Sequence, residues 1–318
     1  CTSDWSIICY TYEQMIRTYQ HNGLTWIDLE SPTREEVRDL MAEYNIHPLV
    51  AEELLLPTLK PKVDLYPDYI YLILHFPAFQ HTHSGASQQE IDFIVGKKFL
   101  ITTHYDTIDP VHKFSKVFEV NSILDRSDLG EHAGYIFFYM VRKLYRSLGH
   151  ELDFMTDSLG QIEQRVFSGN ERDMVFELSR VSRELLHFKH ALSEHHEVLD
   201  SFAAASLKFF GSEFAYHSQS IIGSYHRTDR MVTSNVEFLA ELRETNNSLL
   251  STKQNETMRI LAIISFVTFP LTLVAAIFST DAIHTPIVGN PYDFWIIMGI
   301  MLSIVLCFFL FFKSKHWL

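Results

Sequence analysis

One stretch near the end of the chain restricts the fold more than any other. From Ile260 to Phe278 the sequence contains 19 residues without a charged side chain. A helix rises about 1.5 Å per residue, so this stretch would span roughly 28 Å, close to the hydrocarbon thickness of a bilayer. A second uncharged stretch of 19 residues runs from Phe294 to Phe312. The sequence therefore predicts a two-helix membrane hairpin.

The charges that flank the hairpin predict its orientation. Lys253 and Arg259 precede the first span and two lysines follow the second, whereas the connecting loop contains Asp281 and Asp293 and neither Lys nor Arg. Cytoplasmic loops carry an excess of Lys and Arg. We therefore expect a two-pass membrane protein with both termini in the cytoplasm and the loop outside.

The first span carries a stripe of small and hydroxylic side chains. Ser265, Thr268 and Thr272 recur at intervals of three or four residues, and Ala276 and Ser279 continue the row on the same helical face. Such a stripe either packs against a neighbouring helix or lines a water-filled path. The spacing alone leaves both interpretations open.

Composition excludes several classes of function. The chain has 318 residues and a formal net charge of −13, which argues against a nucleic-acid partner. The sequence shows no nucleophile–base pair, no HExxH motif and no glycine-rich phosphate-binding loop, so neither an enzyme nor an ATP-driven pump is expected. The three cysteines are too far apart for a disulfide framework or a zinc site.

The first part of the chain, residues 1–130, has the pattern of a mixed α/β domain. Short runs rich in β-branched and aromatic residues predict strands at 6–10, 25–29, 69–76, 91–96 and 98–104. A helix is predicted over 31–45, capped by Ser31 or Thr33 with Pro32 in its first turn, and a second short helix over 47–55.

Residues 131–199 predict a helical hairpin. Apolar residues recur every three or four positions over 135–167 and 171–199, and Gly169 marks a turn between them. In the second helix His187, His190 and Glu194 stand at i, i+3 and i+7, on one face. This set has the residue types of a Zn²⁺ site, and it is equally the pattern of a solvated polar face.

Residues 200–257 predict a stalk helix that continues into the first membrane span at 258–280. Only Gly211 and Gly223 weaken the helical signal before Pro270, so one helix of roughly 75–80 residues is expected. A helix this long cannot be stabilised inside one small domain. We therefore expect it to pack against copies of itself.

Two separate stretches resemble the CorA-type divalent-cation transporters. The first is the hairpin, with NETMRIL, PLT and the ending FFKSKHWL; the second is the α/β region, with WIDLESPTREEV, HPLVAEELL and IDFIVGKKFLITTHYD. The resemblance implies an α/β cytoplasmic domain, a long α-helical stalk and a two-helix transmembrane hairpin, assembled as a funnel-shaped homopentamer. It also implies that the first span lines a central pore.

The resemblance assigns roles to residues of the hairpin. The pore face would carry Met258, Leu261, Ser265, Phe269, Thr272 and Ala276. The family ends its first span with Gly-Met-Asn, and here Ser279, Thr280 and Asp281 stand at the pore entrance instead. A ring of five Asp281 carboxylates would then bind the metal ion, unless Asp281 merely ends the helix in solvent. The loop at 281–292, the second span at 293–312 and the basic tail at 313–318 complete the hairpin.

The function implied by this resemblance is transport of divalent cations, with Mg²⁺ as the leading cargo and a possible regulatory ion. Zn²⁺, Co²⁺ or Ni²⁺ transport, or broad cation permeability, are alternatives because the entrance motif differs. A membrane-anchored scaffold that conducts nothing is the alternative from another class. The expected partners are further copies of the chain, the lipid bilayer and metal cations, in a bacterial or archaeal inner membrane.

Overall fold

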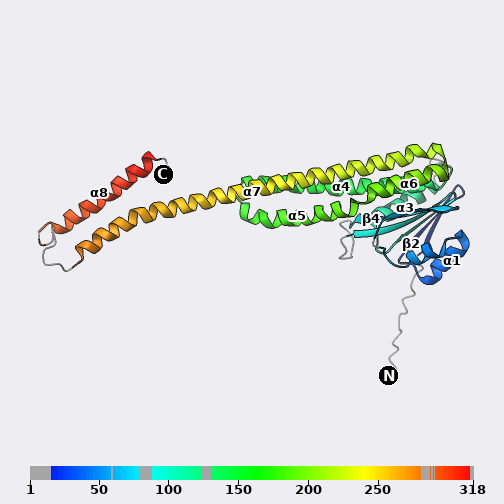
Figure 1. Cartoon of the computed structure of the whole chain (residues 1–318), viewed down its shortest axis with the longest axis horizontal. Coiled ribbons are helices and arrows are strands. Elements are labelled where there is room, and N and C mark those ends of the chain that lie inside the picture. Colours follow the sequence, from blue (N-terminus) through cyan, green and yellow to red (C-terminus); the bar gives the residue numbers. More distant parts are fainter. Residues whose placement is uncertain are drawn as a thin grey trace, which may run out of the picture. The chain divides into compact units, whose positions relative to one another are not determined.

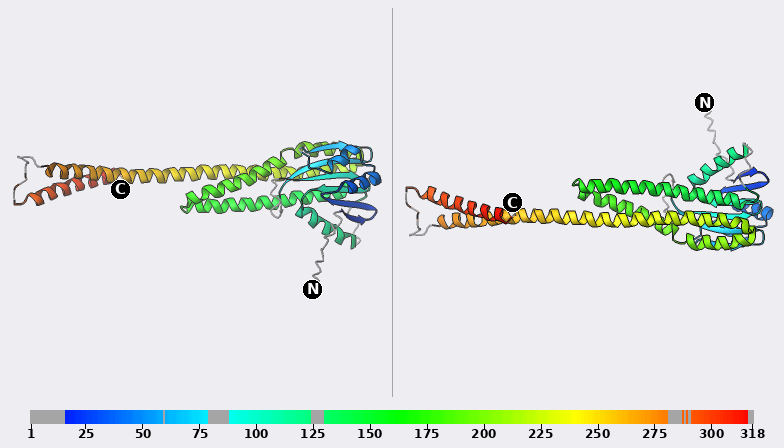
Figure 2. Two further views of the ribbon diagram at one scale, coloured as in Figure 1. Left: turned by 90° about the horizontal axis from the view of Figure 1, so that it is seen from below. Right: turned by 90° about the horizontal axis from the view of Figure 1, so that it is seen from above.

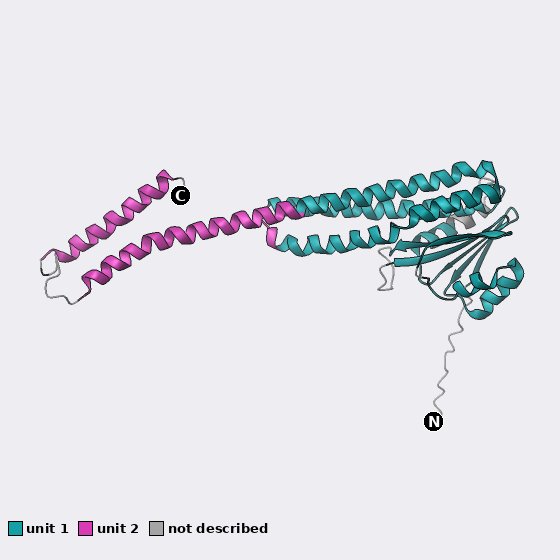
Figure 3. Ribbon diagram, viewed as in Figure 1, with its two compact units in different colours: residues 1–168, 173–242 teal, residues 169–172, 243–318 magenta. Residues whose placement is uncertain are grey.

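The computed structural model describes residues 16–58, 60–78, 88–123, 130–280, 287, 289 and 291–315. They fall into two compact units, drawn in teal and magenta in Figure 3. The first unit comprises residues 1–168 and 173–242, and the second comprises residues 169–172 and 243–318. The strand predicted at 6–10 and the entrance residue Asp281 lie outside the described residues.

A six-stranded mixed sheet forms the centre of the α/β part (Figure 1). Its spatial order is β1-β2-β6-β5-β4-β3, in which only the β2–β6 pair is parallel. The strands are β1 (Ile16–His21), β2 (Leu24–Glu30), β3 (Lys62–Leu65), β4 (Tyr69–Pro77), β5 (Gln88–Gly96) and β6 (Phe99–His104). Four predicted strands are confirmed within a few residues, and the edge strands β1 and β3 were not predicted. Both edge strands are short and partly exposed, so they lack the apolar pattern that identifies a buried strand.

Both faces of the sheet are covered. All nine residues of β4 are buried, which explains why its sequence shows no alternation of polar and apolar residues. Helices α1 (Arg34–Tyr44) and α2 (Pro48–Glu53) pack on one face over Tyr71, Ile73 and Ile94. On the other face Phe93 contacts Phe137, with 5.2 Å between the ring centroids.

Helix α1 begins with a capping box. The Thr33 hydroxyl accepts a hydrogen bond from the backbone N–H of Glu36, and the Glu36 carboxylate accepts one from the backbone N–H of Thr33. Thr33 is therefore the cap, and Pro32 precedes the helix instead of occupying its first turn as predicted. Helix α2 is capped by His47, whose Nδ1 accepts from the N–H of Leu49 at 3.2 Å.

Helix α3 (Asp109–Ile123) was not predicted. Its Phe114 packs edge-on against the buried Trp26 of β2, with 5.5 Å between the ring centroids. Trp26 also donates a hydrogen bond from Nε1 to the Thr102 hydroxyl. The helix thus covers an indole ring from a strand far away in the sequence, which no local pattern indicates.

The predicted helical hairpin contains one more break than expected. Helices α4 (Gly134–Phe167) and α5 (Glu171–Leu192) are joined at Gly169, whose φ of +94° suits glycine. They run in opposite directions in Figures 1 and 2. The predicted helix over 171–199 is confirmed to Leu192 but is not continuous, because the chain turns at Ser193 and Glu194 before α6 (His195–Phe210).

The prediction of one helix from residue 200 to 278 is also wrong. Gly211 has φ +93° and ψ 178°, a conformation that only glycine adopts readily, and it separates α6 from a short 3₁₀ turn, η1 (Ser212–Phe214). Helix α7 (Ala215–Phe278) follows with 64 residues and includes Pro270. Helix α8 (Asp293–Ser314) ends the described chain apart from one residue.

Within the first unit, α7 is fastened to α4 by a buried amide. Asn235 is 4% exposed, and its side chain donates to the carbonyl of Leu152 at 3.1 Å and accepts from the Thr156 hydroxyl at 2.9 Å. Neighbouring apolar residues on both helices are buried as well, among them Met155, Val232 and Leu239. The amide fixes the register of the two helices, because a shift would leave its polar atoms buried without partners.

Candidate functional site: the membrane hairpin

Two helices of the described chain are long and apolar enough to cross a membrane. They are α7, in its last part, and α8. Figure 1 shows α8 running back along the end of α7. No residue in the most apolar window of either helix is buried. Large apolar side chains exposed on this scale are stable in a lipid environment or against further protein copies.

All six residues predicted for the pore face lie in α7. Met258 is 60% exposed, Leu261 54% and Phe269 73%. Ser265, Thr272 and Ala276 also lie in this helix, at helical spacing from the three large residues. The isolated chain therefore presents the whole face without a covering element among the described residues.

The hydroxyl groups of this face all point back to the helix backbone. Ser265 Oγ donates to the carbonyl of Leu261, Thr268 Oγ1 to that of Ile264, and Thr272 Oγ1 to that of Thr268, each at 2.9 Å. A hydroxyl that has given its proton to the backbone offers its oxygen lone pairs outward. The stripe is therefore a row of hydrogen-bond acceptors.

Pro270 adds a further acceptor at the middle of the span. Proline has no N–H, so the carbonyl of Phe266, four residues earlier, loses its usual helical donor. The helix nevertheless continues through Pro270 to Phe278. The freed carbonyl lies within one turn of Phe269 and Thr268.

The end of α7 is capped by its own hydroxyl residues. Ser279 Oγ and Thr280 Oγ1 both donate to the carbonyl of Ala276, at 3.2 and 2.9 Å. The two predicted entrance residues in the described chain thus hold the last turn together and present oxygen atoms there. The sequence analysis did not predict that both hydroxyls bond to the Ala276 carbonyl. A Ser-Thr pair at the end of an apolar helix is a signal for it, because hydroxyls commonly bond to a carbonyl three or four residues back.

The acid at the start of α8 is held by the backbone. Asp293 accepts hydrogen bonds from the N–H of Phe294 at 2.6 Å and from that of Gly289 at 3.4 Å. A carboxylate at a helix N-terminus is stabilised by the helix dipole. Asp293 therefore has a structural role as a helix end, whereas the position of Asp281 is not described.

The residues predicted for a zinc-type site do not come together. His187 and His190 lie on α5, which ends at Leu192, and Glu194 follows as the residue before α6. His190 Nδ1 lies 3.2 Å from the side-chain nitrogen of Gln88. Among the described residues, no group of three or more His, Cys, Asp or Glu side chains is arranged to hold a metal ion. The continuous helix on which this prediction depended does not exist.

A buried hydrogen-bond chain in the first unit was missed by the sequence analysis. Tyr145 on α4 donates to Nδ1 of the fully buried His195, and Nε2 of His195 donates to the carbonyl of His75, both at 2.7 Å. Nε2 of His75 in turn lies 3.0 Å from Glu90 and 3.0 Å from the carbonyl of Thr58. The chain connects α4, α6, β4 and β5. No sequence signal identifies it, because its members are far apart in the sequence.

Two of these histidines have shifted pKa values in opposite directions. Burial lowers the pKa of His195 to about 4, so the ring is neutral at physiological pH. Burial also opposes the charged form of His75, but the hydrogen bond to Glu90 and its charge outweigh burial and raise the pKa of His75. Asp92, beside Glu90 on the same strand, is almost fully buried, and burial raises its pKa well above the ordinary value.

Comparison with known proteins identifies the family. Residues 21–314 match the family described as CorA-like Mg²⁺ transporter protein. The chain belongs to this family. Among its curated CorA relatives is the cobalt/magnesium transport protein CorA of Methanocaldococcus jannaschii, 21% identical over 304 residues that cover 95% of this chain and 93% of the relative. The CorA protein of Thermotoga maritima is 22% identical over 298 residues, which cover 92% of this chain and 83% of the relative.

The fold is that of a solved CorA protein. The complete structure of the CorA magnesium transporter from Methanocaldococcus jannaschii matches with a TM-score of 0.80 and 20% identity, covering 93% of this chain and 92% of that one. The predicted fold class, an α/β domain with a long helix and a two-helix C-terminal hairpin, is confirmed. The prediction that the chain is a transporter-family protein and not an enzyme is confirmed as well.

Proposed function

We propose that this CorA-like chain transports divalent metal cations across a membrane, with Mg²⁺ as the leading cargo. Family membership and the names of its relatives, which are cobalt/magnesium transport proteins, support this class of cargo. The observation that carries the proposal is the row of outward-facing acceptor oxygens at Ser265, Thr268 and Thr272 on an unburied apolar helix.

The acceptor row suits a hydrated divalent cation. Mg²⁺ gives up its water reluctantly, so a hydrated ion presents the O–H groups of its bound water outward as hydrogen-bond donors. Hydroxyl oxygens whose own protons are used by the backbone accept such bonds without displacing the water. The freed carbonyl of Phe266 would act in the same way.

A path for such an ion needs several copies of the chain, because one hairpin cannot enclose water. We propose a homopentamer in which α7 lines the central pore. Rings of Met258, Leu261 and Phe269 would close the path by excluding water, and Ser279, Thr280 and Asp281 would form the entrance. Each divalent ion gains about 4.6 kcal/mol per 100 mV of membrane potential, which drives transport without ATP.

The proposed orientation places both termini in the cytoplasm of a bacterium or archaeon and the loop outside the inner membrane. The basic residues Lys253, Arg259, Lys313 and Lys315 support it, because all four flank the spans on the side of the termini.

Flux through reconstituted protein tests the proposal. The full chain in liposomes should take up Mg²⁺ at a rate that rises with an inside-negative potential. The paired variant Ser265→Ala with Thr272→Val should lower the rate at least about tenfold, since each lost hydrogen bond to a charged species costs roughly 1.5 kcal/mol. Ser303→Ala is the matched control, because the Ser303 hydroxyl is bonded in the same way on α8, to the carbonyl of Gly299.

The ions carried decide between the alternatives. Faster uptake of Zn²⁺, Co²⁺ or Ni²⁺ than of Mg²⁺ would assign a transition-metal cargo, and Na⁺ flux of equal rate would indicate broad permeability. An intact oligomer that carries none of these ions would contradict transport and favour a membrane scaffold.

A further inference from the structure

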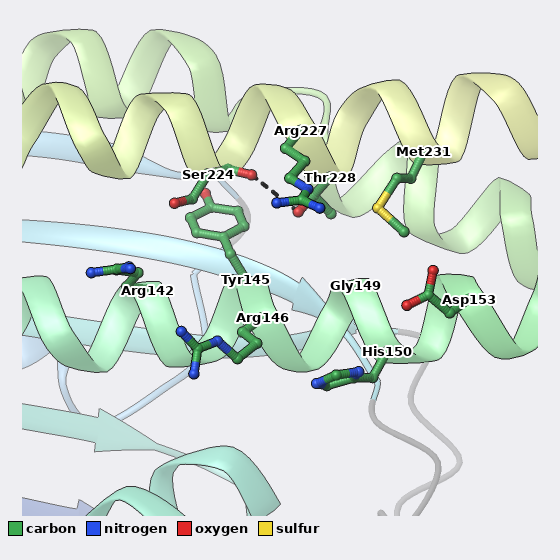
Figure 4. A pocket seen from close by; sticks show the side chains of 10 residues that line it. All are labelled: Arg142, Tyr145, Arg146, Gly149, His150, Asp153, Ser224, Arg227, Thr228 and Met231. Carbon is green, nitrogen blue, oxygen red and sulfur yellow. Dashed lines mark hydrogen bonds between the residues drawn. The ribbon is translucent and has the colours of Figure 1, made fainter.

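A basic hollow lies between α4 and α7 in the first unit. Its volume is about 380 Å³, within the range of roughly 300–1,000 Å³ typical of small-molecule sites. In Figure 4 one wall comes from α4 and the other from α7. The lining residues are Arg142, Tyr145, Arg146, Gly149, His150, Asp153, Ser224, Arg227, Thr228 and Met231.

Most of the basic residues that line the hollow lie in one row on α4. Arg142, Arg146 and His150 follow one another at intervals of four on α4, and Arg227 extends from α7 (Figure 4). Like charges four residues apart on a helix repel each other. A protein with a net charge of −13 thus gathers three arginines around one hollow that has a single acid, Asp153.

These arginines have no acidic partner in the described chain. Ion pairs within 4 Å are formed at other places, such as Arg180 with Glu177 and Lys253 with Glu171, and none includes Arg142, Arg146 or Arg227. Arg142 lies 5.6 Å from the ring centre of Phe138, which orients its guanidinium without neutralising it. None of the three guanidinium groups is therefore held in an ion pair within the described residues, and Asp153 is the one acid that lines the hollow with them.

A glycine leaves room in the hollow. Gly149 lies inside α4, where glycine costs stability relative to alanine, and an added Cβ would meet nothing within 4 Å. Packing therefore does not require glycine here. The missing side chain keeps open the part of the wall between Arg146 and His150.

We propose that this hollow binds a multivalent phosphate anion, either inorganic polyphosphate or the phosphate chain of a nucleotide. Arginine is the side chain that best matches phosphate oxygens, since each planar guanidinium forms paired hydrogen bonds. Arg142 and Arg146 are four residues apart on α4, about 6 Å along the axis, a spacing that two linked phosphoryl groups span. Arg227 supplies the third cation from the opposite helix.

The bound anion would stabilise α6 and β4 as well as the two helices that touch it. Tyr145 belongs to the wall of the hollow, and its hydroxyl holds His195, which bonds to the carbonyl of His75 in β4. A ligand that fixes α4 against α7 therefore also fixes the element that bears this hydrogen-bond chain. Binding should raise the melting temperature of the first unit as a whole.

Titration calorimetry on the full chain in detergent, with pyrophosphate in magnesium-free buffer of constant ionic strength, tests the proposal. Pyrophosphate should bind, and Arg146→Gln and Arg227→Gln should each weaken binding about tenfold or more, the loss expected for a charged hydrogen bond. Gly149→Leu should weaken it as well without changing any charge. Arg165→Gln, an exposed arginine at the other end of α4, is the matched control and should bind like the wild type.

Further probes separate the possible ligands. ATP that binds more tightly than tripolyphosphate would assign a nucleotide, and equal affinities would assign an inorganic phosphate chain. The proposal is overturned if the wild type binds none of these anions, or if all variants bind them equally. Loss of oligomer mass in Arg227→Gln without any anion binding would also overturn it, since the hollow would then receive acidic side chains of a neighbouring copy.

Discussion

Lys253 Nζ lies 2.6 Å from the carboxylate of Glu171 and 3.2 Å from the carbonyl of Gly169. Both contacts are made within the second compact unit. They fasten the turn between α4 and α5 to α7, five residues before Met258, the first residue of the proposed pore face. The hydrogen bond from Lys253 lowers the pKa of Glu171.

This pair predicts a pH-dependent contribution to stability. A carboxyl whose pKa is lowered by folding stabilises the protein above its ordinary pKa of about 4.3 and loses this contribution as the pH falls through the lower folded value. Lys253→Gln and Glu171→Gln should each lower the melting temperature at pH 7, and the double variant should lose less than the sum. The same substitutions in the exposed pair Arg180 and Glu177 serve as the control and should change little. Additive losses at the first pair would contradict the coupling.

His195 predicts a second pH effect on stability, caused by burial of the ring and not by a charged partner. Its pKa falls to about 4 on folding, so the unfolded state binds the proton first as the pH drops below about 6.5. His195→Phe leaves the Tyr145 hydroxyl and the His75 carbonyl unpaired and should cost about 2–5 kcal/mol at pH 7.5. The difference from wild type should shrink between pH 6.5 and 4, measured by thermal or denaturant unfolding.

The pKa of His75 is shifted upward, so protonation of His75 stabilises the fold at low pH, whereas protonation of His195 destabilises it. The effect of His195 is therefore measured as the difference between variant and wild type. The raised pKa of His75 adds stability below its ordinary pKa, and this contribution is lost as the pH rises through the folded value. The His75 side chain and its partner Glu90 are present in both proteins, so most of this contribution cancels in the difference. His187→Gln, an exposed histidine on α5, is the control. A constant difference at all pH values would show that His195 does not titrate as expected.

Two glycines predict opposite outcomes for the same substitution. Gly211 has a backbone conformation that L-residues rarely adopt, so Gly211→Ala should destabilise by about 1–3 kcal/mol although no atom lies near the new Cβ. Gly223 lies inside α7 with equally open space, so Gly223→Ala should stabilise by about 0.5–1 kcal/mol. Equal effects in thermal unfolding would mean that the break before α7 does not depend on Gly211.

The proposed entrance predicts competition between protons and metal ions. If five Asp281 carboxylates form one ring, acid should slow uptake of divalent ions, because protons and cations bind the same oxygen atoms. Asp281→Asn removes the charge and keeps the shape, so it should weaken ion capture and reduce the effect of external pH while the oligomer stays intact. Flux measured against external pH in the same liposomes checks this. Identical curves would leave the entrance to Ser279 and Thr280.

The proposed orientation predicts where the loop can be labelled. In a cysteine-free background, His284→Cys should react with a membrane-impermeant thiol reagent added to intact cells. A cysteine at Ser314, at the end of α8, should react only after the membrane is opened. Labelling in the reverse order would invert the topology.

The sequence by itself determined the parts of this protein whose cause is local. The two spans, a helix cap at Ser31 or Thr33 and the four inner strands follow from runs of apolar residues and from neighbouring side chains, so a short window contains the information. The hydroxyl stripe of α7 was predicted for the same reason, since helical periodicity fixes which residues share a face. What this stripe faces in an assembly stays a prediction.

Tertiary structure alone decided the rest. The turn at Ser193 and Glu194 allows His195 to reach both Tyr145 and His75, partners 50 and 120 residues away in the sequence. The same turn takes Glu194 off the face of His187 and His190. Helix-forming residues stand on both sides of Ser193 and Glu194, so the helix propensity of the local sequence favoured one continuous helix. Burial of a histidine with two satisfied hydrogen bonds outweighs that preference, because leaving its partners unpaired in the core costs more than interrupting a helix.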